Sequence, residues 1–159
     1  MQKSLASLVL FALIASVGSA NAAECTKLPD PATFADLTTA DGGPSKSTGG
    51  DVTDGTYVFT GALIYNSGLP PGTVLATDGA TLSLAAGMYE AISQQLGMPA
   101  VGESGSATFD SDSATATVTT DCPVLSGPTT DGYSFDGTTL VLVVDLGFGL
   151  IAEETLVLQ

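Results

Sequence analysis

The segment GYSFDGTTLVLVVD, residues 132–145, decides the fold class of this chain. Two runs of strand-forming residues flank Asp136-Gly137, and a D-G dipeptide between such runs predicts a tight hairpin turn, because both residues tolerate positive φ. The later run, residues 140–144, is apolar on both faces, so we expect a strand that is central or covered on both sides. The segment therefore predicts a sheet of antiparallel hairpins.

Two further hairpins are predicted upstream by the same reasoning. Asp78-Gly79 is a second D-G dipeptide between two β-prone runs, and it predicts a second tight turn. A third hairpin is expected around Ser111-Asp112. Its second strand, residues 114–119, alternates alanine or valine with threonine, which places the small apolar side chains inward and the threonines outward.

The other segments between turn signals are also short. A strand is expected on both sides of Gly61, where a glycine inside a strand pattern suggests a bulge. Residues 88–96 fit both helical and strand spacing, and a strand is favoured because the surroundings are strands. Residues 98–105 are expected to form a loop. A last hairpin is expected around Glu153-Glu154.

These elements amount to eight or nine short strands with local hairpin connections and no long helical crossover. Such a pattern predicts an all-β fold, namely an antiparallel eight- to nine-strand meander closed into a barrel. Closure hides the sheet edges, which favours the barrel for strands so rich in threonine and valine. A β-sandwich is the alternative architecture.

The N-terminus has the features of a secretory signal peptide, which we assign to residues 1–22. Lys3 precedes an apolar run over residues 5–17, and Ala20-Asn21-Ala22 matches a small-residue cleavage site. The apolar run is too short for a membrane-spanning helix, which needs about 20 residues. Residues 23–53, rich in Pro, Gly, Ser and Thr, are expected to be a lead-in segment, and residues 54–159 a single β-barrel domain.

Charge and cysteine content indicate an exported, acidic protein. The chain carries 17 acidic and 3 basic residues, for a formal net charge of −14. Such a surface repels nucleic acid and anionic membranes, and we interpret it as a solubility device rather than as a calcium-binding surface. In the oxidising compartment that export implies, Cys25 and Cys122 are expected to form a disulfide. Because Glu24 precedes Cys25, we expect no lipid anchor and a secreted or periplasmic protein.

The residues that usually carry enzyme chemistry are scarce. The sequence contains no histidine, which removes histidine-based triads and metal sites, and two cysteines alone cannot form a tetrahedral zinc site. Asp110 and Asp112 lie at a predicted turn, where aspartate is common because it bonds the local backbone. We therefore predict a non-enzymatic protein with no cofactor and no metal site.

Aromatic side chains are the better candidates for a binding site. An eight-strand barrel is either filled by its side chains or holds one small ligand. If the aromatics point inward, a small apolar molecule could be bound between them. The alternative is a filled barrel with a structural or surface-interaction role, presenting outward threonines such as Thr115, Thr117 and Thr119. The candidate lining residues are Tyr57, Phe59, Tyr65, Tyr89, Phe109, Tyr133 and Phe135.

Three short motifs carry a resemblance to known proteins. They are DGTYV at residues 54–58, Asp121-Cys122-Pro123 after a threonine-rich strand, and residues 133–142 with their GTTL turn. In these motifs the chain resembles small secreted lipocalin-like β-barrel proteins of myxobacteria and their relatives, which are mostly uncharacterised. The resemblance covers roughly residues 54–145 and implies a lipocalin-like barrel, but it implies no catalytic residue and no particular ligand.

Overall fold

The computed structural model describes residues 22–123 and 127–159, and almost all of its regular structure is β-strand. Apart from the four-residue helix α1 (Ala22–Cys25), these residues form nine strands in one sheet. The strands are β1 (Ala35–Ala40), β2 (Gly55–Tyr65), β3 (Val74–Ala85), β4 (Met88–Gln95), β5 (Val101–Asp110), β6 (Thr115–Cys122), β7 (Thr129–Phe135), β8 (Thr139–Gly147) and β9 (Leu150–Leu158).

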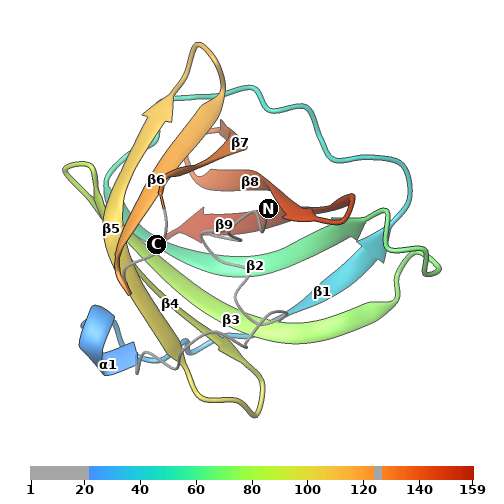
Figure 1. Ribbon diagram of the computed structural model, residues 1–159, viewed down its shortest axis with the longest axis horizontal. Helices are drawn as coiled ribbons and strands as arrows, with labels where there is room; N and C mark the ends of the chain where they lie inside the picture. Colours follow the sequence, from blue (N-terminus) through green and yellow to red (C-terminus); the bar gives the residue numbers. More distant parts are fainter. Residues whose placement is uncertain (1–21, 124–126) are drawn as a thin grey trace.

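The sheet closes into a ring, as Figure 1 shows. From β2 to β9 each strand pairs with the next one in antiparallel register, and β9 pairs back onto β2, with Tyr57 opposite Leu158 and Tyr65 opposite Ile151. The prediction of an all-β barrel of eight to nine strands is therefore confirmed. The expected bulge at Gly61 is present as well, because the β2–β9 register shifts between Phe59 and Gly61.

β1 makes the sheet mixed, and it comes from the segment that we predicted to be a lead-in. β2 and β3 pair directly only near one end, over Gly55 to Val58. Beyond that point β1 lies between them, parallel to β2 and antiparallel to β3, with Leu37 opposite Ala62 on one side and Ala76 on the other. Leu37 is fully buried. Residues 35–40 are thus part of the barrel wall.

Two of the predicted turns are wrong, and β3 and β9 run straight through them. Asp78 and Gly79 lie within β3, where they pair with residues of β4. Gly79 is needed for a close approach instead of a turn, because a Cβ there would collide with the carbonyl oxygen of Thr33. In the same way, Glu153 and Glu154 lie inside β9 and pair with residues of β2 and β8.

The actual turns at these places use residues with positive φ. β3 and β4 are joined by Ala86-Gly87, at φ of 52° and 78°, and β8 and β9 by Phe148-Gly149, at 56° and 82°. Both are two-residue turns in which both residues take positive φ, the property that tight hairpins require. Alanine and phenylalanine rarely adopt this conformation, so neither two-residue turn was predicted.

The other hairpin predictions agree with the structure in outline. The chain reverses at Asp136-Gly137, with Phe135 opposite Leu140, and it also reverses at Ser111-Asp112. Residues 88–95 form a strand, as favoured. The loop expected over residues 98–105 is wrong beyond its first residues, because β5 begins at Val101.

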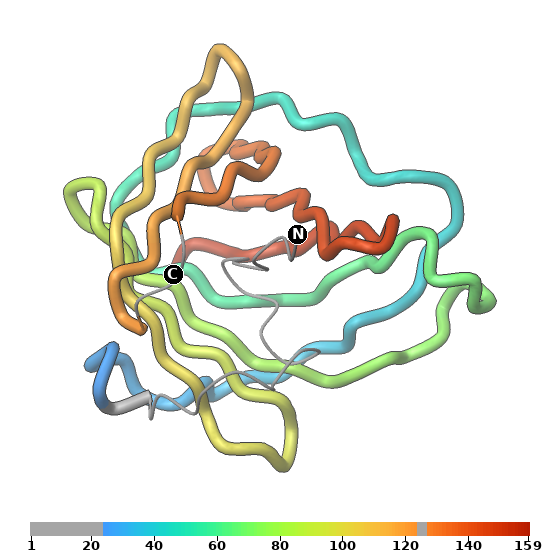
Figure 2. The backbone as a smooth tube through the Cα atoms, in the orientation of Figure 1, coloured from blue at the N-terminus to red at the C-terminus, as the bar shows by residue number. Residues whose placement is uncertain are grey.

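One end of the barrel is covered by the chain between β1 and β2, which we call the cap (residues 47–54). Figure 2 shows this stretch passing from the end of β1 to the start of β2. The backbone N–H of Gly49 donates to the carbonyl of Tyr133, and the N–H of Phe135 donates to the carbonyl of Gly49. Val52 packs against the hydrophobic core. The opposite end, which we call the mouth, is formed by the loops at residues 66–73, 96–100 and 148–149.

The disulfide joins the N-terminal segment to the mouth end of β6. Cys25 and Cys122 are bonded at 2.06 Å between sulfur atoms, across a sequence separation of 97 residues. This prediction is confirmed, and the bond indicates an oxidising environment outside the cytoplasm. The described residues include no helix of the length and apolar character that crossing a membrane requires.

Candidate functional site

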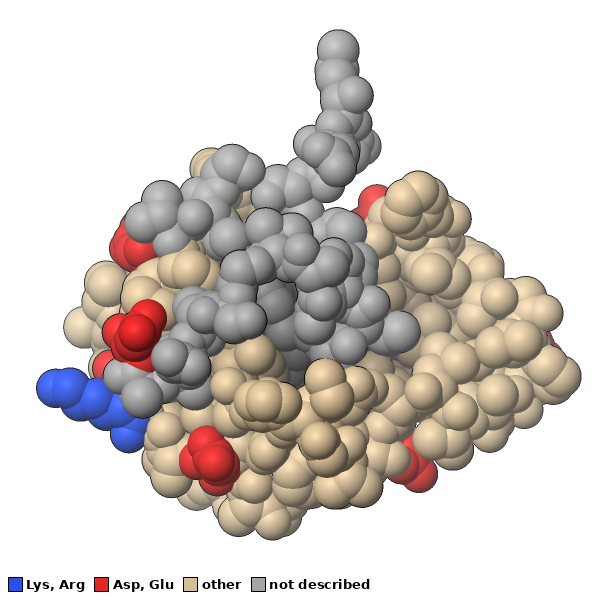
Figure 3. Space-filling view, turned by 60° about the horizontal axis from the view of Figure 1, so that its bottom comes forward, with Lys and Arg blue, Asp and Glu red and all other residues tan. Residues whose placement is uncertain are grey.

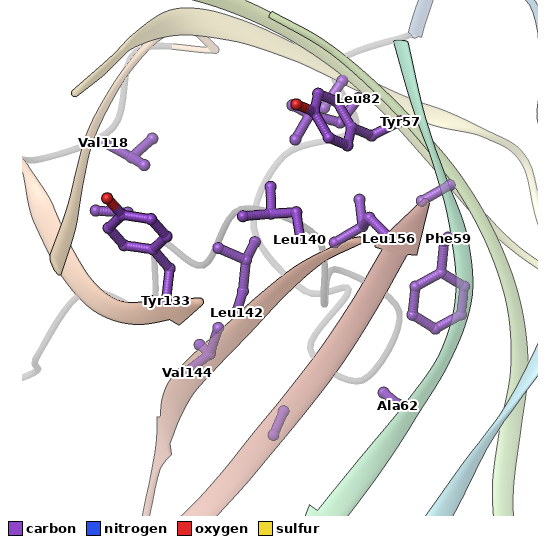
Figure 4. Close-up of a cluster of buried hydrophobic side chains, with 14 of the residues drawn as sticks. Tyr57, Phe59, Ala62, Leu82, Val118, Tyr133, Leu140, Leu142, Val144 and Leu156 are labelled. Carbon is purple, nitrogen blue, oxygen red and sulfur yellow. The ribbon is translucent and has the colours of Figure 1, made fainter. Parts of the chain in front are cut away.

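The predicted aromatic residues gather mainly in the half of the barrel next to the cap. Tyr57, Phe59, Tyr89 and Tyr133 are buried in the hydrophobic core, and Phe109 and Phe135 pack against it half-buried. Figure 4 shows labelled side chains from β2 and from β6 to β9 pointing into this core. Two ring pairs meet edge to face: Tyr57 with Phe135, and Phe109 with Tyr133, at centroid distances of 6.2 and 5.2 Å.

Tyr65 lies elsewhere. It follows the inward-facing Ile64 in β2, so it points to the outer face of the barrel, and it is not part of the core cluster. Burial and the nearby charge of Glu153 raise the pKa of its hydroxyl. Six of the seven predicted residues therefore come together inside, and the seventh does not.

The hydroxyl groups of the inward tyrosines are all occupied. Tyr57 donates to the carbonyl of Thr53 at 2.6 Å, and Tyr133 donates to the carbonyl of Gly50 at 2.8 Å. Both contacts hold the cap in place. The hydroxyl of Tyr89 lies 2.7 Å from that of Thr120. With their polar atoms bonded and their rings packed, these aromatics form the structural core of the capped half.

The mouth half of the barrel holds a different set of inward side chains, which we call the inner carboxylates: Asp78, Glu103, Asp131 and Glu154. They come from β3, β5, β7 and β9, one from every second strand. Their cross-strand partners identify the face they occupy, because directly paired residues share one side of a sheet. Glu103 is opposite the buried Ala91, and Glu154 is opposite Ala62 and Leu142.

Three of the inner carboxylates have oxygens that are buried and unpaired. Glu154 is 0% exposed and Glu103 is 4% exposed. Within residues 22–123 and 127–159, neither oxygen of these two side chains has a hydrogen-bond partner, and Oδ1 of Asp78 has none either. Native proteins bond the great majority of buried polar atoms, so such a group calls for a specific explanation. Leaving one unpaired costs about 1–3 kcal/mol.

The electrostatics follow from this burial. Burial, followed by the charges of Asp131 and Asp78, raises the pKa of Glu154 to about 8. Burial and the charge of Glu154 raise the pKa of Glu103 well above its ordinary value. Burial raises the pKa of Asp78 to about 6, and burial together with Asp145 raises that of Asp131 to about 6. Near neutral pH Glu154 is thus largely protonated, whereas the two aspartates are largely ionised.

Sequence reasoning missed the inner carboxylates because three of them fell in segments interpreted as turns or loops. Acidic residues are ordinary there, so Asp78, Glu103 and Glu154 attracted no attention. The period-two alternation of inward and outward positions along the strands is the signal that identifies them. Glu154 is in phase with Ala152 and Leu156, which are both fully buried. No group of three or more of the described acidic and cysteine residues is arranged to hold a metal ion.

Exposed apolar side chains occur on the loops of the mouth. Phe148 is 100% exposed at the tip of the β8–β9 turn. The neighbouring loops carry three more large exposed hydrophobic residues: Leu69, Leu96 and Met98. We call these four residues the mouth rim.

The opposite, capped end has a shallow pocket and the outer surface has scattered charges. The pocket measures about 250 Å³ and is lined by cap residues together with Leu84, Met88 and Phe109. Figure 3 shows acidic side chains as separate spots among uncharged ones on one face of the molecule. Dispersed surface charge of this kind fits the solubility interpretation.

Comparison of the chain with family models, with curated proteins and with solved structures found no match. The resemblance to secreted myxobacterial proteins stays a prediction.

Proposed function

We propose that this protein is a non-enzymatic, exported β-barrel that binds one small molecule in the mouth half of its interior. The observation that carries the proposal is the pair of buried, unpaired carboxyl groups of Glu103 and Glu154. A ligand that supplies hydrogen-bond donors there would remove the cost of leaving these atoms unpaired.

The division of the interior supports this position for the ligand. An eight-strand ring has room for its own side chains or for one small ligand. The aromatics already occupy the capped half, with their hydroxyls bonded. In the mouth half the sheet neighbours of the unpaired glutamates are small, namely Ala91 beside Glu103 and Ala62 beside Glu154. The ligand expected from the sequence was purely apolar, and the inner carboxylates add a polar requirement to it.

Binding is favoured over catalysis by the way the carboxyl groups are set. Hydrolysis by two carboxylates places one in an environment that keeps it protonated and its partner in one that keeps it ionised. Here Glu103 and Glu154 share one environment, and burial is the largest influence on the pKa of both. The pair that carries the proposal is therefore not divided into an acid and a base.

Export is supported by two features that are independent of each other. The N-terminal residues have the pattern of a signal peptide. The disulfide between Cys25 and Cys122 requires an oxidising compartment. We propose that the protein acts in the periplasm or outside the cell.

Native mass spectrometry of the mature protein, purified from its own host, tests the binding function. We expect a mass above that of the polypeptide, which falls to the polypeptide mass on denaturation. Ala62→Phe, which places a large side chain beside Glu154, should lose the added mass. Leu63→Phe, on the outer face of the same strand, should keep it. A bare wild-type protein would contradict the proposal.

A structural or surface-interaction role is the second candidate, and one observation favours it. Thr108, Thr117 and Thr130 lie opposite one another on the outer faces of β5, β6 and β7. The hydroxyls of Thr117 and Thr130 are 3.3 Å apart. Thr115 and Thr119 share this face of β6. If the wild-type protein carries no added mass, this threonine surface becomes the place to look for function.

A further inference from the structure

We propose that the ligand is a small amphiphilic organic cation, whose protonated amine lies among the inner carboxylates and whose apolar part extends toward the mouth rim. This inference rests on the proposed binding function and names the chemical class of its ligand. It is carried by the charges, the hydrogen-bonding capacity and the apolar surroundings of the inner carboxylates.

The charges inside the barrel are of one sign. The inner carboxylates supply four acidic groups, and the sequence has no arginine or histidine to compensate them. Both lysines of the described residues, Lys27 and Lys46, are exposed on the outside. Buried charges in proteins are paired or coordinate a cation. The described residues therefore supply no positive charge inside the barrel, and a cationic ligand would provide it.

The unpaired oxygens of the inner carboxylates indicate a cation that carries hydrogen-bond donors. Five buried carboxyl oxygens of Asp78, Glu103 and Glu154 lack a partner among the described residues. A carboxylate only accepts hydrogen bonds, and a primary ammonium group offers three donors and no acceptor. Such charge-assisted bonds are about twice as strong as neutral ones. A protonated amine thus supplies a positive charge and three of the hydrogen-bond donors that these oxygens lack.

The surroundings require an apolar part as well. The mouth half is not uniformly acidic, because the inner carboxylates alternate with apolar side chains on the same inner face. Four of these are buried: Leu37, Ile64, Val144 and Ala152. The mouth rim continues the apolar surface outward, with Phe148 fully exposed. A molecule with a charged head and a short hydrocarbon part meets both kinds of surface.

The release of a proton from Glu154 distinguishes the binding of a cation from that of a neutral hydrogen-bond donor. With a pKa of about 8, Glu154 holds its proton in the free protein at pH 7. The groups that face it are Asp78 from β3, Glu103 from β5 and Asp131 from β7, while β2 and β8 place Ala62 and Leu142 beside it. A cation favours the ionised carboxylate and so displaces the proton. A neutral alcohol does not.

Isothermal titration calorimetry on the exported, disulfide-bonded protein tests the inference with three eight-carbon probes: octylammonium, octanol and octanoate. We expect octylammonium to bind at least tenfold more tightly than octanol, and octanoate to bind most weakly. Titrations at pH 7 in two buffers of different ionisation enthalpy should show protons released on binding of octylammonium and none for octanol.

Paired variants locate the effect. Glu154→Gln keeps the shape of the side chain and removes its charge, and it should weaken octylammonium binding at least tenfold while leaving octanol unchanged. Glu153→Gln changes the next residue, which faces outward and accepts a hydrogen bond from the backbone of Ser45, and it should leave both affinities unchanged. If Glu154→Gln does not fold, the probe series and the proton release on the wild-type protein still decide the matter.

The possible failures of the two proposals differ. Octanol or octanoate binding as tightly as octylammonium would overturn the cationic ligand and leave the binding function standing. A host-derived ligand found by mass spectrometry to be neutral or anionic would do the same. A protein that is bare from its host and binds none of the three probes would overturn both proposals.

Discussion

The capped half and the mouth half of the barrel both place polar atoms inside, but they treat them differently. In the capped half the hydroxyls of Tyr57 and Tyr133 donate to backbone carbonyls of the cap. In the mouth half the carboxyl groups of Glu103 and Glu154 are buried with no partner in the described chain. Satisfied polar groups fix a single core arrangement, whereas unsatisfied ones lower stability. In the capped half these hydrogen bonds stabilise the fold. In the mouth half the buried carboxyl oxygens have no hydrogen-bond donor, and we propose that a ligand supplies it.

The largest expected effect comes from the covalent bond at the mouth end. Replacing both cysteines by serine removes the disulfide between α1 and β6. Its two cysteines are 97 residues apart in the sequence. A loop of that length contributes about 4–5 kcal/mol in the chain-entropy model, and real values are often smaller. We expect the Cys25→Ser, Cys122→Ser protein to melt well below the wild type under oxidising conditions. Equal melting temperatures would show that the mouth half does not depend on this bond.

The pH dependence of stability should be the next largest effect, and its sign is the reverse of ordinary acid denaturation. Between its unfolded pKa of 4.5 and its folded pKa of about 8, Glu154 binds more proton in the folded state. The free energy of unfolding therefore falls as pH rises through this range, by up to about 1.4 kcal/mol per pH unit for one such group.

Urea unfolding at pH 5, 6 and 7 measures this dependence. We expect the protein to lose about 3 kcal/mol over these two pH units from Glu154. Asp78 and Asp131, with pKa values raised to about 6, add to the loss at the lower end of the range. Glu154→Leu should flatten the curve. A stability that rises from pH 5 to pH 7 would refute the buried, protonated glutamate.

The smallest expected effects are two substitutions of opposite sign, one in each half. Glu154→Leu removes a buried carboxyl with no described partner and should raise the free energy of unfolding by about 1–3 kcal/mol at pH 7. Tyr133→Phe removes a hydroxyl that is bonded to the cap and should lower it by about 1 kcal/mol.

Chemical denaturation of these two variants beside the wild type compares the halves directly. Thr108→Val on the exposed outer face serves as a control that should change little. If both Glu154→Leu and Tyr133→Phe destabilise the protein, the two halves treat their polar atoms alike.

The barrel itself could be predicted from the sequence, because strand patterns and turns repeat along the chain. The turn signals gave wrong predictions where tertiary contacts determine the backbone conformation. Asp136-Gly137 forms a turn, whereas Asp78-Gly79 continues a strand because the chain near Thr33 packs closely over that glycine. The position of β1 could not be predicted from its own residues, because it depends on the separation of β2 from β3.

The candidate site was predicted in part for a related reason. Six of the aromatic residues named from the sequence lie inside the barrel, because large apolar side chains are often buried. The inner carboxylates were not predicted there, because a buried acid contradicts the usual preference of its residue type. Glu103 and Glu154 therefore show where the fold departs from local preference, and such departures are expected at functional sites.

The pairing of β9 with β2 has a consequence for the order in which the protein assembles. The two strands are paired through Tyr57 and Leu158, so the seam of the ring joins residues about 100 positions apart in the sequence. The ring closes only when β9 pairs with β2, and contacts between residues so distant in sequence slow folding. The local hairpins between consecutive strands can therefore form before the ring closes.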